Sequence, residues 1–391
     1  MIVFLDQTGE LGGAELSLLD IVKSRVDASR VILFSDGPFR QRLAAAGTPV
    51  TVIAGDAIFG VRRGSGLFAA MKSAPALAAL VWRVAARARS AEILYANTQK
   101  AFVVAALAGI LARRPVVWHL HDILSSEHFS GAMRAITVRL ANAKAACVIA
   151  NSKASADAFR QAGGKAPLRV VYNGIDPAPF DAVDSSLARA RLCGELGVAT
   201  APLVGVFGRL AEWKGQHIVV EALKGLPKLH AVLVGGALFG EAQYEARLRR
   251  QAIESGLSGR VHFLGFRDDV PAIMKAVDIV VHASVAPEPF GRVIVEGMLA
   301  GKPVIATRAG GVLEIIEDGV TGLLAPPGDV AALEAAIRRL LAEPELAKRL
   351  ADRGRAEANR RFSLKSCLSS VETVNASVRD YGDPTARVPI R

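Results

Sequence analysis

Short apolar runs that recur along the chain, with helical stretches between them, constrain the fold more than any other feature. Runs of two to six residues are too short for buried helices, and their spacing is typical of strands joined by helices. Alternation of this kind predicts a parallel sheet covered on both faces. In the first half the expected strands are Met1–Asp6, Val31–Phe34, Val50–Ile53, Ile93–Tyr95, Val116–Trp118, Val148–Ile149 and Val170–Val171.

The second half of the chain repeats the pattern. Its expected strands are Leu203–Phe207, His230–Val234, Val261–Leu264, Ile279–Val281 and Pro303–Ala306. A chain of 391 residues suits two domains better than one. We therefore expect an α/β protein with two Rossmann-like domains. The expected boundaries are an N-terminal domain at 1–172, a linker at 173–202, a second domain at 203–362, and a C-terminal helix with a loose tail at 363–391.

The charge is unevenly placed. The formal net charge is +11, and residues 1–176 hold 21 Lys and Arg against 12 Asp and Glu. A positive half indicates an anionic partner, such as a phosphorylated acceptor, an acidic lipid surface or nucleic acid. No RNP or zinc-finger pattern occurs, so nucleic acid is not expected.

Membrane spans and disulfides are not expected either. The longest apolar run, Ala101–Ala112, has 12 residues, against about 20 for a spanning helix. The start lacks a charged region and a cleavage site, so we expect a cytoplasmic protein, with a peripheral place at the inner face of the cytoplasmic membrane as the alternative. Three distant cysteines predict reduced thiols and no zinc site.

A pair of glutamates brackets the start of an expected helix. Pro287 and Pro289 break the chain after a strand, and an apolar helical face follows, so a helix should begin near Phe290. The free N–H groups and the dipole at that end favour an anion such as phosphate. Glu288 lies just before this end, and Glu296 lies about two turns inside the helix.

The spacing of these glutamates disfavours glycoside hydrolysis. Eight helical residues span roughly 12 Å, and a glycosidase pair needs roughly 5 to 9.5 Å. Glu288 and Glu296 would then hold two parts of one long ligand, or they are surface residues beside a core helix.

Two cations follow the first strand of the second domain. Arg209 and Lys214 lie five residues apart in the loop after Leu203–Phe207, where a phosphate would dock. Arginine offers a two-pronged donor and lysine a compact charge, so the two could hold a diphosphate. The turn at Gly310–Gly311 is a further place for backbone N–H groups near a phosphate. The alternative is a basic surface loop.

Three strand ends of the first domain carry candidate ligand groups. Gly12–Gly13 does not fit G-x-G-x-x-G, which argues against a dinucleotide enzyme, but it could bring backbone close to a phosphate or sugar. Asn97 follows another strand, and the run His119–Asp122 a third. Histidine exchanges a proton near neutral pH, and Asp122 could orient it. We expect only one of His119 and His121 to face the ligand, because side chains alternate along an extended chain.

Taken in order, these motifs run along nearly the whole chain, and together they resemble the family 4 retaining glycosyltransferases of the GT-B fold. The resemblance implies two facing Rossmann-like domains with parallel sheets and a deep interdomain cleft. It also favours His121, since these enzymes carry a histidine at the end of this strand. The motifs are Gly12–Gly13, His121–Asp122, Asn173–Gly174, Gly208–Arg209 with Lys214–Gly215, and Glu288 to Glu296.

By this resemblance the donor is a nucleotide-diphosphate sugar, with UDP favoured over GDP. Glu296 would bind the ribose hydroxyls, Arg209 and Lys214 the diphosphate, and Glu288 the sugar. No other cofactor is implied. A glycan, lipid-linked or small-molecule acceptor would enter from the basic first domain.

The resemblance also assigns the remaining contacts. The amides of Phe290 and Gly291 would hold the sugar, and Gly12 and Gly13 would close over the phosphates. In the front-face mechanism proposed for such enzymes the departing phosphate takes the acceptor's proton. The candidate catalytic residues are His121, Glu288, Arg209 and Lys214.

No Asp-x-Asp occurs in the chain, so no divalent metal is expected. The alternatives are an epimerase or a phosphorylase of the same fold, or a non-catalytic protein that binds an anionic ligand. A phosphorylase would need a Schiff-base lysine region and a longer chain. The basic segment Ala57–Arg89, which contains Trp82, is a candidate for binding an anionic membrane surface.

Overall fold

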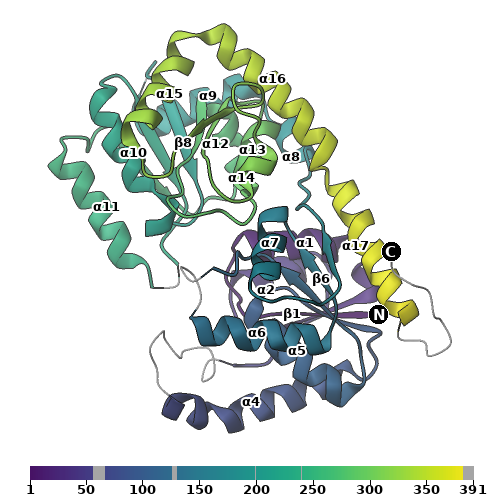
Figure 1. Ribbon diagram of the computed structural model, residues 1–391. Coiled ribbons are helices and arrows are strands. Elements are labelled where there is room, and N and C mark those ends of the chain that lie inside the picture. Colours follow the sequence, from purple (N-terminus) through teal and green to yellow (C-terminus); the bar gives the residue numbers. More distant parts are fainter. Residues whose placement is uncertain (56–66, 126–129, 199, 239, 382–391) are drawn as a thin grey trace. The chain divides into compact units, whose positions relative to one another are not determined.

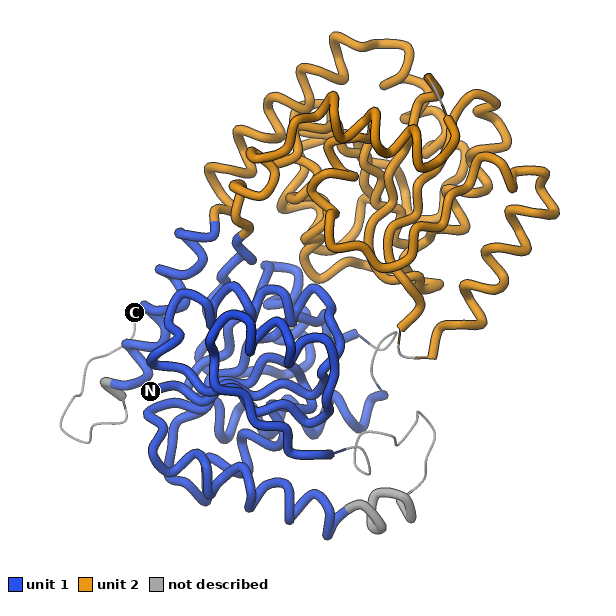
Figure 2. Tube along the Cα trace, turned by 180° about the vertical axis from the view of Figure 1, so that it is seen from behind, with its two compact units in different colours: residues 1–174, 364–391 blue, residues 175–363 orange. Residues whose placement is uncertain are grey.

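The chain forms two compact units, each with its own parallel sheet. The computed structural model describes residues 1–55, 67–125, 130–198, 200–238 and 240–381. Unit 1 comprises Met1–Gly174 and Leu364–Arg391, and unit 2 comprises Ile175–Ser363 (Figure 2). The prediction of two α/β units is confirmed. The cleft expected between them stays a prediction.

Unit 1 contains a seven-stranded sheet in the order β3-β2-β1-β4-β5-β6-β7, all strands being parallel (Figure 1). The strands β1 and β5 are buried along their whole length because helices cover both faces of the sheet. The strands are β1 (Ile2–Asp6), β2 (Ser29–Leu33), β3 (Val50–Val52), β4 (Ile93–Ala96), β5 (Val116–Leu120), β6 (Ala145–Ala150) and β7 (Leu168–Val170).

Two hydrophobic cores flank this sheet. One is built with helices α4 (Leu67–Ala88), α5 (Gln99–Ala112), α6 (Gly131–Lys144) and α7 (Lys153–Gln161). The other is built with α1 (Gly13–Lys23), α2 (Pro38–Ala45) and α17 (Leu364–Tyr381). A short 3-10 turn at Val26–Ala28 connects α1 to β2. Helix α17 returns to unit 1 after the whole of unit 2 and buries Val371, Val374 and Val378.

Unit 2 contains a six-stranded parallel sheet in the order β10-β9-β8-β11-β12-β13. Its strands are β8 (Leu203–Phe207), β9 (His230–Val234), β10 (Val261–Gly265), β11 (Ile279–His282), β12 (Val304–Thr307) and β13 (Leu323–Ala325). Its helices are α8 (Ala178–Asp181), α9 (Ser185–Leu196), α10 (Gln216–Ala222), α11 (Ala242–Glu254), α12 (Val270–Ala276), α13 (Arg292–Leu299), α14 (Val312–Ile315), α15 (Val330–Ala342) and α16 (Pro344–Arg361), with 3-10 turns at Glu212–Lys214 and Leu223–Gly225.

The segment expected to be a linker, 173–202, contains helices instead. From Ile175 onward it belongs to unit 2, and α9 packs on α12. Asp184 caps α9 by accepting hydrogen bonds from the N–H groups of Ser186 and Leu187, and Gly197 ends the helix in the left-handed conformation. Pro177 and Gly197 therefore mark the ends of short helices in this segment.

Each sheet has one point where the strand order reverses. In unit 1 the chain builds outward from β1 to one side and from β4 to the other, and in unit 2 the same change falls between β8 and β11. Ligands of such sheets bind beyond the carboxyl ends of the strands at this point. The two switch points are therefore where the predicted site residues should gather.

No helix of the described residues is long and apolar enough to cross a membrane. Of the segment 57–89, residues 57–66 lie outside the described residues, as does the tail 383–391.

Candidate active site

The switch point of unit 2 brings together Lys214, from the loop after β8, and Glu288, from the loop after β11. The Lys214 ammonium donates to Oε1 and Oε2 of Glu288 at 2.9 and 2.7 Å. Sequence reasoning placed Lys214 on a diphosphate and Glu288 on a sugar, with a basic surface loop as the alternative for Lys214. The surface loop is wrong for Lys214, because only 19% of its side chain is accessible and it is paired with a buried carboxylate.

Two residues of β11 and its loop complete the cluster around Glu288. His282 Nε2 and the Ser284 hydroxyl each lie 3.0 Å from Glu288 Oε2. Thr307, at the end of β12, has its hydroxyl 3.5 Å from His282 Nδ1. Glu288 is therefore held by groups from β11 and from the loops after β8 and β11, and Thr307 of β12 contacts His282 behind it.

Burial and the surrounding charges act in opposite directions on Glu288. Burial alone would raise the pKa of this carboxyl, but the Lys214 charge and the His282 hydrogen bond outweigh it. The pKa of Glu288 is held well below its usual range. Glu288 is thus a permanent anion, which can accept hydrogen bonds from hydroxyl groups but cannot act as an acid near neutral pH.

Glycines allow the loops of this site to touch. Gly215 has φ +70°, and a Cβ there would lie 1.9 Å from the Ala283 carbonyl oxygen. A Cβ on Gly310 would lie 2.4 Å from the Glu288 carbonyl oxygen, which accepts a hydrogen bond from the Gly311 N–H at 2.8 Å. The Gly310–Gly311 turn therefore supports the backbone of Glu288 directly.

The other predicted residues of unit 2 lie on the same loops and helix. Arg209 Nε is 3.4 Å from Glu241 Oε2, and both side chains are about one quarter exposed. Helix α13 begins at Arg292, two residues after the expected start, with Gly291 at φ +104° as its cap. Glu296 accepts a hydrogen bond from Arg292 Nε at 3.1 Å. Phe290 is buried against Phe362.

The switch point of unit 1 holds a second buried polar cluster. Asp6, the last residue of β1, accepts a hydrogen bond from Asn97 Nδ2 at 2.7 Å, and Asn97 follows β4. His121 Nε2 lies 3.0 Å from Asn97 Oδ1. The structure therefore links two of the three strand ends selected from the sequence, and it adds Asp6.

His119 and His121 lie on the same side of the chain, with ring centroids 3.9 Å apart. The expectation that they alternate was wrong, because residues two apart on a strand share a face. Burial depth separates them instead. His119 is fully buried, its Nδ1 lies 2.8 Å from the Tyr95 hydroxyl, and burial holds its pKa well below the usual range. His121 is half-buried and is the histidine that a ligand can reach.

In the Gly12–Gly13 turn of unit 1, one backbone N–H group already has a hydrogen-bond partner within the protein. The Gly12 N–H donates to Glu15 Oε2 at 3.0 Å, so a carboxyl group of α1 already uses this amide. Burial, and next the charge of Asp6, raise the pKa of Glu15 to about 8. A Cβ on Gly13 would meet nothing within 4 Å, so the open part of the turn is at Gly13.

Sequence reasoning missed His282, Ser284 and Asp6. A signal existed for two of them. Asp6 and His282 are polar residues at the last position of otherwise apolar strands, which is where a parallel sheet presents side chains to a ligand.

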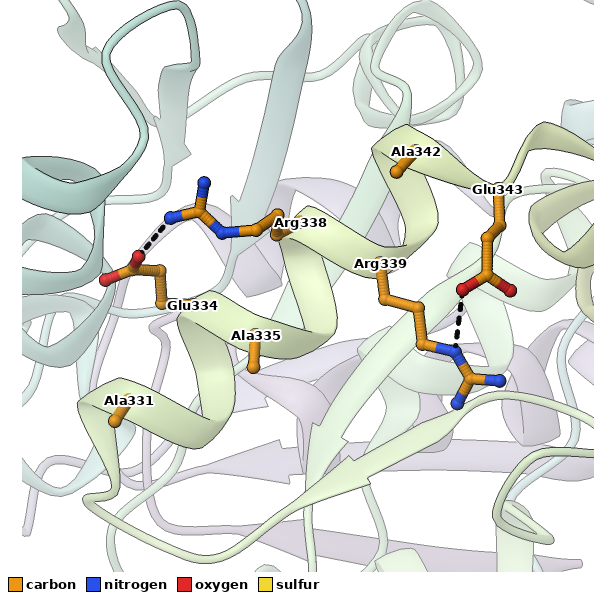
Figure 3. Close-up of a pocket in the computed structure, with 7 residues that line it drawn as sticks. All are labelled: Ala331, Glu334, Ala335, Arg338, Arg339, Ala342 and Glu343. Carbon is orange, nitrogen blue, oxygen red and sulfur yellow. Dashed lines mark hydrogen bonds and ion pairs between the residues drawn. The ribbon is translucent and has the colours of Figure 1, made fainter.

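A hollow elsewhere on unit 2 is unrelated to these clusters. It runs along α15 and is lined by that helix and Glu343 alone (Figure 3). Its charged residues pair with each other, Glu334 with Arg338 and Glu343 with Arg339. This is an ordinary solvated helix face.

Comparisons with known proteins identify the family of the chain. Residues 12–179 match the family model described as Glycosyltransferase Family 4, and residues 195–357 match the model described as Glycosyl transferases group 1. The chain belongs to the family 4 glycosyltransferases, and its two Rossmann-like units are those of the GT-B fold.

Among solved structures, the chain is similar to HepE of Anabaena, crystallised in complex with UDP-glucose. The two are 45% identical, with a TM-score of 0.89, over 96% of this chain and 99% of HepE. WaaG, a glycosyltransferase involved in lipopolysaccharide biosynthesis, is 18% identical with a TM-score of 0.71, which supports the fold alone.

Among curated relatives, the lipopolysaccharide core biosynthesis glycosyltransferase LpsE of Rhizobium meliloti is 35% identical over 59% of this chain and 64% of LpsE. The 2-deoxystreptamine glucosyltransferase of Streptomyces kanamyceticus is 32% identical over 45% of this chain and 46% of that enzyme. The chain thus spans about half to two thirds of the length of these curated relatives.

Proposed function

We propose that the chain is a retaining glycosyltransferase that moves a sugar from a UDP-sugar to a glycan, lipid-linked or small-molecule acceptor. The observation that carries the proposal is the cluster of Lys214, Glu288, His282 and Ser284 at the switch point of unit 2. UDP-glucose is the favoured donor because HepE, 45% identical over almost its whole length, was crystallised with it.

Unit 2 would bind the donor. The Lys214 ammonium has three N–H donors, and its bonds to Glu288 use two of them, so one can serve a phosphate oxygen. Arg209 and the amino end of α13 would supply further positive potential. As an anion, Glu288 would accept hydrogen bonds from sugar hydroxyls, and Glu296 from those of the ribose.

The reaction would need no side chain of unit 2 to donate or accept a proton. The acceptor hydroxyl attacks the anomeric carbon on the face from which the diphosphate departs. The bond from this carbon to the phosphate oxygen breaks, and that oxygen takes the acceptor's proton. Positioning, and stabilisation of the leaving charge by Arg209 and Lys214, would supply most of the rate. No metal is part of this scheme.

Donor preference and stereochemistry are both measurable without knowing the acceptor. UDP at about 100 times its dissociation constant should add about 2.7 kcal/mol to the free energy of unfolding, and GDP and ADP at the same concentration less. Slow hydrolysis of UDP-glucose, followed by proton NMR, should release α-glucose first. Release of β-glucose would exclude retention, and equal effects of the three nucleotides would exclude the UDP assignment.

A membrane-facing surface on unit 1 is favoured by one specific observation. Helices α4, α5 and α6 contain no Asp or Glu. Trp82 is 65% exposed and Leu111 59% exposed, and the exposed arginines Arg83 and Arg87 lie beside Trp82. Apolar and cationic side chains mixed in this way suit the interface of an anionic bilayer.

Flotation with vesicles tests this surface. The chain should float with vesicles rich in phosphatidylglycerol and less with phosphatidylcholine alone. Replacing Arg83 and Arg87 by Glu should reduce flotation at least about threefold, since each cation near an anionic surface contributes about 1 kcal/mol. The matched control replaces Arg349 and Arg353, exposed at the same spacing on α16 of unit 2. Equal flotation of both variants would exclude the surface.

A further inference from the structure

The polar cluster of unit 1 determines which nitrogen of His121 carries a proton. Asn97 Nδ2 lies 2.7 Å from Asp6 Oδ2 and 3.1 Å from the Ala14 carbonyl oxygen. A carbonyl oxygen can only accept, so the Asn97 atom that faces Ala14 must be the amide nitrogen. The other amide atom, which faces His121, is therefore the oxygen.

This orientation makes His121 the donor in its bond to Asn97. Asn97 Oδ1 can only accept, and it lies 3.0 Å from His121 Nε2. A hydrogen bond between them requires the proton to be on Nε2. In the neutral ring the other nitrogen, Nδ1, is then the acceptor.

The groups behind His121 are rigidly held. Asp6 and Asn97 are fully buried, the Asn97 N–H donates to the Leu5 carbonyl at 2.9 Å, and Asp6 Oδ1 accepts from the Thr8 N–H at 3.2 Å. Asn97 has both amide hydrogens occupied by acceptors. It has no low-energy way to turn its amide round toward His121.

We propose that Asp6 and Asn97 are positioning residues that hold His121 as the tautomer protonated on Nε2, so that Nδ1 is the nitrogen that accepts a hydrogen bond from a bound hydroxyl group. The inference rests on the proposed function only for the identity of that hydroxyl, which belongs to the sugar or the acceptor. The tautomer itself follows from the hydrogen bonds.

Other titratable groups surround the cluster and set its pH response. They come from α1 (Glu15), from β5 (His119) and from the residue after His121 (Asp122), and the charge of Asp122 acts on Glu15. Burial keeps His119 neutral, so it adds no competing charge beside His121.

Nitrogen NMR of the full chain with labelled histidine measures the tautomer directly, and His121→Gln identifies the signal. In the wild-type protein, neutral His121 should carry its proton on Nε2. Asn97→Ala should give a mixture of both tautomers and lower the rate of UDP-glucose hydrolysis about tenfold with little change in the donor KM. Asn97→Asp places a carboxylate against Nε2 and should raise the pKa of His121.

The matched control is Asn375→Asp, which introduces the same change at another fully buried asparagine of unit 1. It should lower stability and leave the His121 signals unchanged. A proton on Nδ1 in the wild-type protein, or His121 signals that do not respond to Asn97→Ala, would overturn the inference. If the signals respond as expected while the pH dependence of hydrolysis does not move in Asn97→Asp, the positioning holds and the role of His121 in transfer is wrong.

Discussion

The two units place a buried carboxyl group at the same point of their sheets, yet the two groups have opposite electrostatics. Asp6 ends β1 and is fully buried, and Glu288 follows β11 and is 8% exposed. Burial raises the pKa of Asp6 to about 7, against the hydrogen bonds it accepts from Asn97 and nearby backbone. The pKa of Glu288 is instead held well below its usual range.

The difference lies in the partners. Asp6 accepts hydrogen bonds from neutral amides, whereas Glu288 accepts from the ammonium of Lys214. Neutral donors do not repay the loss of water around a buried carboxylate, but a cation within 3 Å does. One unit therefore has a permanent anion suited to binding hydroxyl groups. The other has a titrating cluster next to a histidine.

The largest expected effect comes from removing the cation. Lys214→Ala leaves Glu288 buried without its charged partner, and this should lower the free energy of unfolding by about 3 to 4 kcal/mol at pH 7. Because Glu288 then behaves like Asp6, its pKa should rise above the ordinary value. Turnover should fall at least about tenfold, since the leaving charge loses a cation. Chemical denaturation and initial rates measure both.

The control for this experiment is the double variant Lys214→Ala with Glu288→Gln. Removing both charges leaves no uncompensated group, so most of the lost stability should return while turnover stays low. If the single variant is as stable as the wild-type protein, the cation does not account for the difference between the two clusters.

The next largest effect concerns Asp6. Its folded pKa of about 7 lies above the ordinary value of 3.8, so ionising it opposes folding. This penalty is absent below about pH 4, grows by about 1.4 kcal/mol per pH unit until about pH 7, and changes by about 3 kcal/mol between pH 4.5 and pH 7.5. Asp6→Asn should remove this dependence. The measurement is the difference in unfolding free energy between pH 4.5 and pH 7.5 in the two proteins.

Glu15→Gln provides the companion variant. The pKa of Glu15 is raised to about 8, partly by Asp6, so its penalty extends to a higher pH. This variant should flatten the stability curve between about pH 4.5 and pH 8. Identical slopes in the wild-type protein and both variants would show that the cluster is not titrating.

A smaller loss of stability is expected from removing Arg209 than from removing Lys214. Arg209 pairs with Glu241 at 3.4 Å in a more exposed position than Lys214. Arg209→Ala should therefore cost less than about 1 kcal/mol of stability, yet lower turnover about tenfold if the guanidinium holds phosphate. Arg209→Lys should recover only part of the rate. A loss of stability as large as that of Lys214→Ala would contradict the comparison.

The fold could be predicted from the sequence because its signals are local. Each strand is a short apolar run, and alternation with helices predicts that the strands are parallel and covered on both faces. Residues 173–202 were misinterpreted for the same reason. Pro177 and Gly197 break the chain locally, but α9 packs on α12, and no local pattern reports that contact.

The sites were predictable only in part. Glu288, Lys214 and His121 stand out because their positions after strands mark a ligand edge. The ion pair between Lys214 and Glu288 could not be predicted, because the two residues are 74 positions apart in the chain. Asp6 and His282 were missed because each belongs to an apolar strand and is polar at its last position alone.

The smallest expected effect tests whether the donor site extends along α13. Glu296 bonds Arg292 within that helix, so Glu296→Ala removes only a partly buried pair from the fold. If Glu296 binds the ribose, its loss should raise the donor KM about fivefold with kcat nearly unchanged, because ribose contacts are the same in the ground and transition states. Arg292→Ala is the control, since it breaks the same pair but keeps the carboxylate. A donor KM raised equally in both variants would assign the effect to the ion pair. A donor KM raised only in Glu296→Ala would place the Glu296 carboxylate on the nucleoside. Helix α13 would then contact the donor at two places, through Glu296 and through its amino end.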